Sequence, residues 1–242
     1  MKIKSAVLIL LAVCFALPVY AQTNKQELSA LLGGMVQSDK WIIRKDKAEE
    51  EFTGNVKYEN DIYKITADKV LSQRALFTYT LSGNVFARRS QDGSTLTLTA
   101  NKVVFNQKQD YGYAQGTQKK QVHLKLYNEA DIFNLYADKL NFGGKFTGFE
   151  AQGDCEINDL DNTLYAGKMT FDTQTQVFTA QESRPLFFGY NADGDYALQA
   201  DTITADNKNG IYTAQGRVQG WIVPAEDISK YTQGNKDGAK IF

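Results

Sequence analysis

The stretch Thr99-Ala100-Asn101-Lys102-Val103-Val104-Phe105, followed by Tyr113-Ala114-Gln115-Gly116, is one copy of a unit that recurs along the chain. Each copy has an Ala-Asp/Asn/Gly-Lys/Thr-apolar box and, after a polar turn, a second box that in most copies ends in Gly. The leading alanines are Ala67, Ala100, Ala137, Ala166 and Ala200. The trailing Gly follows 16 residues later in four copies, and Glu182 takes its place in the copy that begins at Ala166. A fixed offset within the unit and variable spacing between units indicate one supersecondary unit stacked repeatedly.

Strict alternation of apolar and polar residues predicts β-strands. Thr95-Leu96-Thr97-Leu98-Thr99-Ala100 is the clearest case, because Leu96, Leu98 and Ala100 share one face and three threonines share the other. Short turns rich in Asn, Asp, Gly and Gln separate the strands, and no helical period lies between them, which favours an antiparallel sheet. Small residues at fixed points allow a long sheet to bend over itself. We therefore expect an all-β fold, a single elongated twisted β-jellyroll of repeated antiparallel strands.

The ends of the chain differ from this β region. Residues 1–21 have a basic start, an apolar run and Val19-Tyr20-Ala21 before Gln22, the pattern of a secretory signal peptide. A retained N-terminal anchor is the alternative. Residues 22–50 are expected to be a partly ordered lead-in, residues 51–223 the β-jellyroll domain, and residues 224–242 a polar, disordered tail. An exported protein is therefore predicted.

Composition and single residues argue against several function classes. Of the 27 Lys and Arg residues, Lys2 and Lys4 lie in the predicted signal, which leaves a net charge of −3 against 28 acids and gives no basic surface for nucleic acid. His123 alternates with Lys125 on a predicted strand and is interpreted as a solvated residue. Cys155 has no local histidine partner and is interpreted as a structural or surface thiol. No nucleophile elbow, phosphate loop or zinc ligand set is found, so we predict no enzyme activity and no cofactor.

The acids of the repeat need separate consideration. Asp68, Asp138 and Asp201 occupy one slot of the unit, and stacked carboxylates are able to bind calcium or to act in glycosidases. Asn101 and Gly167 break that series, and Lys follows the slot in four of the five copies. A neighbouring Lys at a strand end is better explained as an exposed charge or a turn cap, so the series does not indicate a metal site or a catalytic pair.

The inward face is predicted from alternation alone. By itself, this pattern fits a packed core better than an open groove for an apolar ligand. Core candidates also include Phe86, Phe188 and Ile211. The residues predicted to line the interior, and to contact an apolar ligand if it is open, are Ile65, Leu96, Leu98, Phe105, Leu124, Leu126, Phe142 and Phe171.

The repeat boxes resemble a known family. Gly54-Asn55-Val56, Ile65 to Val70, Gly83-Asn84-Val85, Leu98 to Phe105 and Ala114-Gln115-Gly116 are similar in order and spacing to the OstA-like family, the LptA-like periplasmic lipopolysaccharide-transport proteins. The resemblance covers residues 50–223 and is strongest in 52–116. Glu182 and Arg184-Pro185 depart from the pattern, which leaves the geometry of that bend open.

The resemblance implies a partly open β-jellyroll that holds lipopolysaccharide acyl chains in its apolar interior. It also implies inner-membrane LptC-like and outer-membrane LptD-like partners, head-to-tail self-association, and transfer of lipid toward the outer membrane. With the resemblance included, an open groove is favoured over a closed core. The alternative is a non-enzymatic β-repeat binding or structural module of the cell envelope with a closed core.

Overall fold

The computed structural model describes residues 35–91, 93–127, 132–143, 148–191, 194–206 and 208–224. The predicted signal peptide and the part of the predicted tail that follows Pro224 lie outside these residues. Within them, no helix is long and apolar enough to cross a membrane.

The described chain is built almost entirely of β-strands, with one short 3-10 helix, η2 (Arg74–Leu76), between β4 and β5. The strands are β1 (Met35–Gln37), β2 (Lys40–Arg44), β3 (Glu49–Glu59), β4 (Tyr63–Gln73), β5 (Thr78–Gln91), β6 (Ser94–Asn106), β7 (Tyr111–Gln115), β8 (Val122–Tyr127), β9 (Ile132–Ala137), β10 (Lys139–Gly143), β11 (Phe149–Asn158), β12 (Asn162–Asp172), β13 (Val177–Gln181), β14 (Leu186–Asn191), β15 (Gly194–Gln199), β16 (Thr202–Asp206), β17 (Ile211–Gln215) and β18 (Gln219–Pro224).

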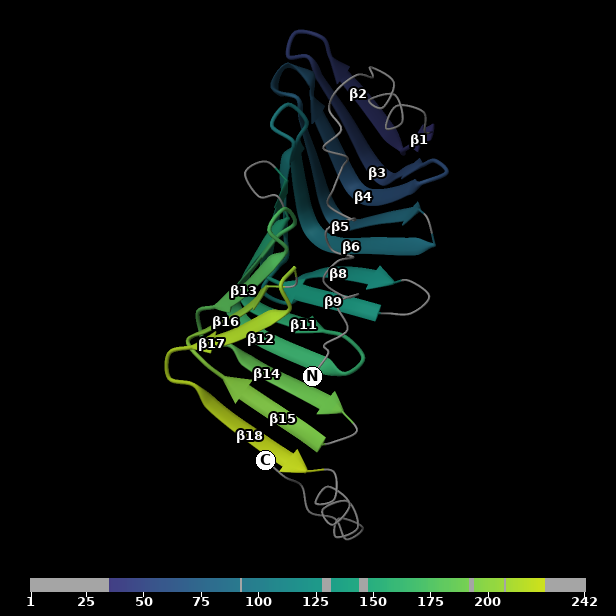
Figure 1. Cartoon of the computed structure of the whole chain (residues 1–242). Coiled ribbons are helices and arrows are strands. Elements are labelled where there is room, and N and C mark those ends of the chain that lie inside the picture. The colour runs from purple at the N-terminus through teal and green to yellow at the C-terminus, as the bar shows by residue number, and fades with distance from the viewer. Residues whose placement is uncertain are drawn as a thin grey trace.

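The sheet is folded into two facing layers that share their longest strands. β3–β6 pair in sequence order along their length and curve through both layers, as Figure 1 shows. The ladder divides at β6, where residues 95–99 pair with β8 and residues 102–106 pair with β7. It rejoins at β11, which pairs with β10 at one end and β9 at the other, and divides again after β12. All of these pairings are antiparallel.

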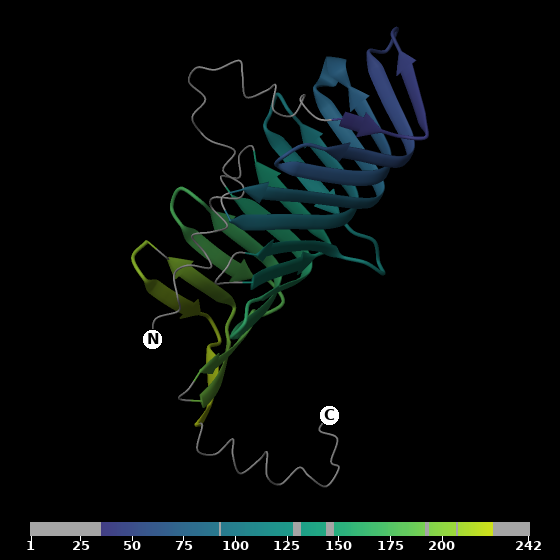
Figure 2. The ribbon, with the colours of Figure 1, turned by 90° about the vertical axis from the view of Figure 1, so that its right-hand side faces the viewer.

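We call the two halves the first and second layers. The first layer contains β2, β7, β10, β13, β16 and β17, and the second contains β1, β8, β9, β14, β15 and β18; β3–β6, β11 and β12 pass through both. Figure 2 shows the strands stacked along the long axis of the molecule. The predicted fold class, an elongated antiparallel all-β jellyroll, is confirmed. Among the described residues the first strand begins at Met35, so β1, β2 and the first residues of β3 lie within the segment predicted as a lead-in.

The bend between the layers coincides with the small residues of the repeat. The register shifts there, between Thr53 and Val56, between Ser82 and Val85, and at matching points of β4 and β11. The leading alanines pair across the bend with a second small or β-branched residue: Val56 with Ala67, Val85 with Ala100, Val122 with Ala137, and Cys155 with Ala166. All eight side chains are buried. Small side chains are needed because the two layers are closest together at the bend.

A close contact between an acid and a glycine accompanies most of the bends. A Cβ added to Gly83 would lie 2.8 Å from Cγ of Asp68, and the φ angle of Gly83 is +72°. The same relation joins Gly153 to Asp138 and Gly216 to Asp201. Only glycine combines this backbone conformation with so close an approach. The acids of this slot therefore pack against a glycine at the bend.

The structure reveals one more copy of the unit at the N-terminal end. Asp39 packs against Gly54 as Asp68 packs against Gly83. The amide of Asn55 donates to Asp39 Oδ2 at 2.9 Å, and the amide of Asn84 donates to Asp68 Oδ2 at 3.0 Å. The box Ser38-Asp39-Lys40 was overlooked because it begins with Ser instead of Ala, although Gly54 follows Ser38 by the same 16 residues.

In the copy that begins at Ala166, the two partners of this contact are exchanged. Glu182 occupies the usual glycine slot, and Gly167 occupies the usual acid slot, so the small residue lies on the other strand. A Cβ added to Gly167 would lie 3.0 Å from Cβ of Glu182 and 2.8 Å from Oγ of Ser183. The backbone N–H of Gly167 donates to the carbonyl oxygen of Glu182 at 3.0 Å. The bend is therefore kept at the point where the sequence departs from the pattern.

The contact between Gly83 and Asp68 can be tested with a matched glycine. Gly83→Ala is expected to lower the free energy of unfolding by about 1–3 kcal/mol more than Gly93→Ala. Both glycines have a positive φ, of 72° and 74°, but nothing lies within 4 Å of a Cβ added to Gly93. Urea unfolding followed by circular dichroism measures both variants. Equal losses would show that the contact with Asp68 has no energetic role, whereas partial recovery in Gly83→Ala/Asp68→Gly would support the steric explanation.

Candidate functional site

The candidate site is the inward face between the two layers. Residues that pair directly across antiparallel strands point to the same face, so the register assigns each side chain to the inside or the outside. Ile65, Leu98 and Leu124 share one row of the second layer, through the pairings of Ile65 with Ala87, Ala87 with Leu98, and Leu98 with Leu124. Leu96 and Leu126 form the next row toward the turns.

The three phenylalanines that were predicted to line the interior lie on the first layer. Phe105 pairs with Gly112, Gly112 pairs with Phe142, and Phe142 pairs with Phe149, which pairs with Phe171. All eight predicted interior residues are thus brought onto the same inward face. Leu124, Leu126 and Phe171 are buried, while Ile65, Leu96, Leu98, Phe105 and Phe142 are half-buried. Whether any of them contacts a ligand is still a prediction.

Three core candidates were placed on the wrong face. Phe86 pairs with Thr66 and Thr99, Phe188 pairs with Thr163 and Ala197, and Ile211 pairs with Asp206. These rows belong to the outer face, and Ile211 is exposed. Hydrophobicity alone misled here, because the face of a residue depends on its register relative to the bend and not on its own side chain.

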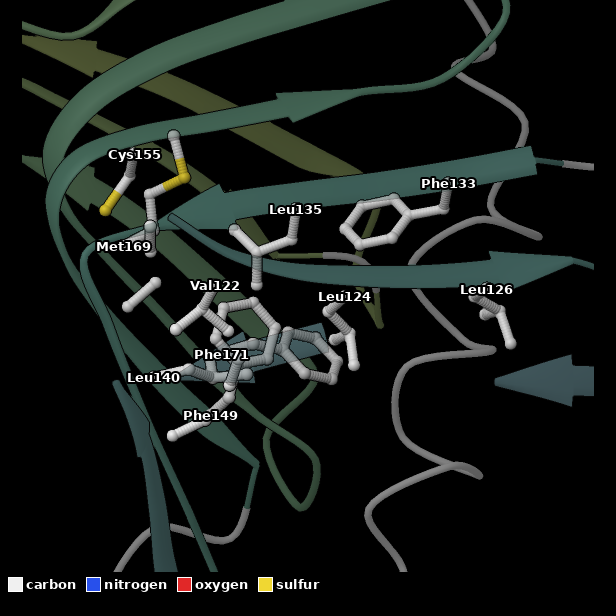
Figure 3. Close-up of a cluster of buried hydrophobic side chains, with 14 of the residues drawn as sticks. Val122, Leu124, Leu126, Phe133, Leu135, Leu140, Phe149, Cys155, Met169 and Phe171 are labelled. Carbon is white, nitrogen blue, oxygen red and sulfur yellow. The ribbon is translucent and has the colours of Figure 1, made fainter. Parts of the chain in front are cut away.

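The middle of the interior is closely packed. Figure 3 shows Val122, Leu124, Leu135, Leu140, Phe149, Met169 and Phe171 converging from both layers. All of them are buried, and the rings of Phe149 and Phe171 lie 6.1 Å apart. Leu135 and Leu140 were not among the predicted core residues, although the alternation in Ile132-Phe133-Asn134-Leu135-Tyr136-Ala137 was a usable signal.

The ends of the interior are more open than the middle. At the N-terminal end, Trp41 pairs and stacks with Phe52 on the inward face and is 57% exposed. At the C-terminal end, Ile222 lies opposite Tyr196 on the inward face and is 80% exposed. Val36, Ile43 and Tyr212 are further exposed inward-facing residues on the terminal strands. Apolar surface is therefore presented to solvent at both ends of a continuous apolar interior.

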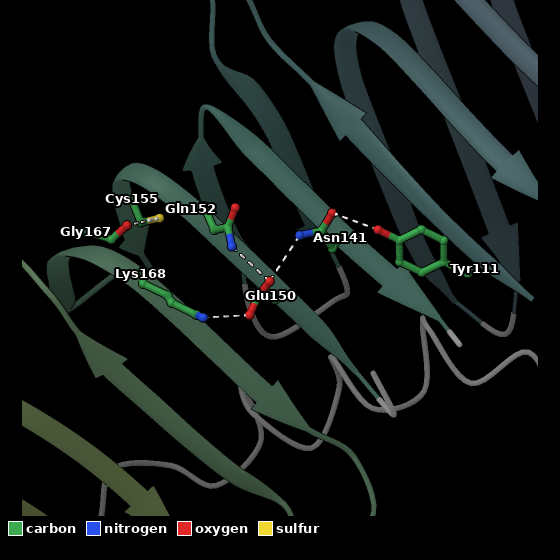
Figure 4. Close-up of polar contacts among 7 residues, drawn as sticks. All are labelled: Tyr111, Asn141, Glu150, Gln152, Cys155, Gly167 and Lys168. Carbon is green, nitrogen blue, oxygen red and sulfur yellow. Dashed lines mark hydrogen bonds and ion pairs between the residues drawn. The ribbon is translucent and has the colours of Figure 1, made fainter. Parts of the chain in front are cut away.

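The outer face carries most of the polar groups. Figure 4 shows Glu150 at the centre of one network, where it accepts from the amides of Asn141 at 3.1 Å and Gln152 at 3.0 Å and pairs with Lys168 at 2.8 Å. The ion pair with Glu150 raises the pKa of Lys168 above its ordinary value. His123 also lies on this face, where it stacks on Tyr136 and hydrogen bonds with Asn134. It is a structural residue of the sheet surface in this arrangement.

The repeat acids do not converge on a catalytic pair. Asp68 hydrogen bonds with Asn84, and Asp138 accepts from Gln121 at 3.3 Å. Asp201 forms an ion pair with Arg217, and hydrogen bonding to that guanidinium lowers the pKa of the carboxyl. Among the described residues, no group of three His, Cys, Asp or Glu side chains is placed to hold a metal ion.

A polar hollow of about 690 Å³ lies near the bend. Its lining includes Lys119, Asp154, Glu156, Tyr165 and Arg184. Glu156 pairs with Tyr165 and Tyr165 with Leu186, in a row that belongs to the outer face of the second layer. This hollow therefore opens on the outer face, and the buried Cys155 and Ala166 at the bend form its floor.

Comparisons with known proteins give a limited result. No family model matches the sequence, and no curated protein matches it. The chain is similar in structure to LptH from Pseudomonas aeruginosa, described as the LptA homologous periplasmic component of the conserved lipopolysaccharide transport device. The identity is 10%, the TM-score is 0.31, and the match covers 79% of this chain and 95% of that chain.

Cys155 is buried at the bend, in the slot that Val56 and Val85 occupy in other copies. Its burial, followed in size by the nearby charges of Asp138 and Asp154, raises the pKa of the thiol to about 12. The thiol lies 3.8 Å from the carbonyl oxygens of Gly153 and Gly167. The interpretation as a structural thiol fits this environment, because only the thiolate is nucleophilic.

The buried thiol should be unreactive in the folded protein. In protein that lacks residues 1–21, Cys155 is the sole cysteine. At about pH 8, iodoacetamide should label the native protein at least about 100-fold more slowly than urea-unfolded protein, where the thiol pKa returns to about 8.5. Mass spectrometry of the alkylated protein measures the rate. Equal rates in the two states would contradict the assigned environment.

Proposed function

We propose that this protein is a periplasmic lipid-carrying bridge that binds lipopolysaccharide acyl chains in its apolar interior and passes them toward the outer membrane. The observation that carries the proposal is the continuous apolar face between two layers, exposed at both ends. The resemblance of the repeat boxes to the OstA-like family supports the same function. The predicted signal peptide supports the location.

The inward rows provide an apolar path along the molecule. One row of the first layer runs by direct pairing through Trp41, Phe52, Val70, Leu81, Val103, Ala114, Leu140, Ala151, Met169, Ala180, Ile203 and Ala214. Every residue in it is apolar. Burial of an acyl chain against such a surface contributes about 25 cal/mol per Å² before the entropy cost of binding.

The N-terminal part of the interior is the proposed first binding region. In the next row of the first layer, the positions on β3 and β4 are Glu50 and Ser72, whereas the positions on β11–β13 are Phe149, Phe171 and Phe178. Phenylalanines thus occupy this row in the middle of the molecule, whereas smaller or polar side chains occupy it on β3 and β4. We therefore place the acyl chains among the half-buried Ile65, Leu96, Leu98 and Phe105, and transport past the middle requires the two layers to separate there.

The strands at each end are suited to assembly. Among the described residues, β1 and β2 pair only with β3, β17 pairs only with β16, and β18 pairs only with β15. Each has one edge of backbone donors and acceptors open to another strand. Head-to-tail self-association and pairing with inner-membrane LptC-like and outer-membrane LptD-like components are parts of this proposal.

The packed middle favours one alternative. A non-enzymatic β-repeat module of the cell envelope with a closed core would have the same buried Leu124, Leu135, Phe149 and Met169. It would not need exposed apolar side chains at the inward ends, and it would bind no lipid. The two functions therefore differ in whether lipid reaches the interior.

A pair of substitutions on one strand tests the lipid path. Leu98→Asp should reduce copurified lipopolysaccharide by about tenfold or more, because an ionised carboxylate is costly to keep against acyl chains. Thr97→Asp, on the adjacent outer-face position of β6, should leave the amount of copurified lipopolysaccharide unchanged. Both side chains are half-buried in the free protein. Copurified lipid is quantified by mass spectrometry after membrane extraction and affinity purification.

A photo-crosslinking amino acid at the same positions gives an independent readout. Position 98 and position 105 should crosslink to lipopolysaccharide in intact cells, and position 97 should not. The unfolding midpoint of each aspartate variant is measured alongside, so that loss of fold is not mistaken for loss of binding. Undiminished lipid in a folded Leu98→Asp variant, with no crosslink from position 98, would favour the closed module.

A further inference from the structure

The inward face of the described strands carries almost no charge. Its register positions hold apolar side chains, glycines and a few polar groups such as Ser72 and Asn162. The two charged exceptions among the described strand residues are Glu50 on β3 and Arg89 on β5. Glu50 lies on the first layer and forms an ion pair with Arg74 of η2. Arg89 is therefore the single inward-facing cation of these strands.

Arg89 lies at the rim of the interior. It pairs with Tyr63 on β4 and with Leu96 on β6, and Leu96 pairs in turn with Leu126. This is the outermost apolar row of the second layer, just before the turn between β5 and β6. Leu96 packs against the core, which fixes the whole row, and with it Arg89, on the inward face. The neighbouring Arg88 points to the outer face and is exposed.

The distance from Arg89 to the bend suits an amphipathic ligand. Val85, buried at the bend, is four residues before Arg89, which corresponds to about 13 Å of extended strand. Between them on the same face lies only Ala87, the smallest side chain of its row. An acyl chain that lies along this strand would have its apolar end at the bend and its head at the guanidinium.

The guanidinium has the chemistry to hold such a head. Its Nη2 donates to Gln91 Oε1 at 2.6 Å, which aligns the side chain along the rim. Arginine has five N–H donors in a planar fork, and two of them match the oxygens of a phosphate or a carboxylate. Charge-assisted contacts of this kind are stronger where water is partly excluded.

We propose that Arg89 is the anchor for the anionic head of the lipid, with phosphate as its preferred group, and that it sets how deeply the acyl chains enter the interior. This assignment rests on the proposed lipid-carrying function and adds a residue that selects among lipids. Lipids with the same chains and no anionic head should bind without using Arg89. The interior would then favour phosphorylated lipids over neutral ones.

The test compares two adjacent arginines. Arg89→Gln and Arg88→Gln remove the same charge, one from the inward face and one from the outer face. Dioleoyl phosphatidic acid and dioleoylglycerol, which differ only in the phosphate, are titrated in detergent micelles against the full chain, with displacement of an apolar fluorescent dye as the readout. Oleic acid and oleyl alcohol repeat the comparison for a carboxylate. Each titration is run at low and at high salt.

Arg89→Gln should weaken phosphatidic acid binding about tenfold at both salt concentrations, and Arg88→Gln by no more than about twofold. Dioleoylglycerol should bind all three proteins equally. Arg89→Lys keeps the charge and loses the planar fork, so its affinity for phosphatidic acid should lie between those of wild type and Arg89→Gln. If Arg89→Gln does not fold, the affinity of Arg89→Lys decides the question. A larger effect with oleic acid than with phosphatidic acid would overturn the preference for phosphate.

If Arg88→Gln and Arg89→Gln weaken phosphatidic acid binding equally, and high salt abolishes this effect, the anchor would be overturned. General electrostatic attraction of the lipid to the protein surface would then explain the binding. No weakening by Arg89→Gln would overturn the anchor as well. In both cases, binding of dioleoylglycerol to wild type would still support the lipid-carrying function. If wild type binds neither of the two lipids, the lipid-carrying function and the anchor both fail.

Discussion

The close approach of an acid side chain to a glycine across the bend is the constraint on which the two-layer arrangement depends. At Gly54, Gly83, Gly153 and Gly216 the backbone has a positive φ, and the next residue has a positive φ too. Such a pair bends a strand without ending it. The sheet can therefore continue through the bend and form both layers from the same strands.

The contact acts through shape more than through charge. The hydrogen bond from Asn84 to Asp68 and the ion pair between Arg217 and Asp201 are exposed to solvent, where such interactions contribute little. The exchange of Gly167 and Glu182 supports this view, because the bend is kept when the large and small partners change strands. Three successive residues, Glu182, Ser183 and Arg184, adopt positive φ angles there without a glycine. Gly167, which lies opposite them, has no side chain to collide with Glu182 or Ser183.

The sequence allowed the fold class to be predicted, since period-2 alternation and a constant offset are local features. The inward face was also predictable for strands such as Thr95 to Ala100, where alternation is strict. The prediction of the inward face failed at Phe86 and Phe188. Each bulge changes the local count of residues, and a large apolar side chain can cover the outer face. The anchoring position of Arg89 could not be seen either, because adjacent arginines on one strand look alike until the register separates them.

Variation among the units is concentrated on the outer side of the bend. Val85 follows Gly83 by two residues, but Val122 follows Gly116 by six, so that copy has an insertion at Thr117 to Lys120. Lys119 of this insertion and Arg184 of the exchanged bend both line the polar hollow near the outer face. Val122 still pairs with Ala137, as Val85 pairs with Ala100. Because both irregularities keep the pairing at the bend, the units can differ outside while the apolar face between the layers stays continuous.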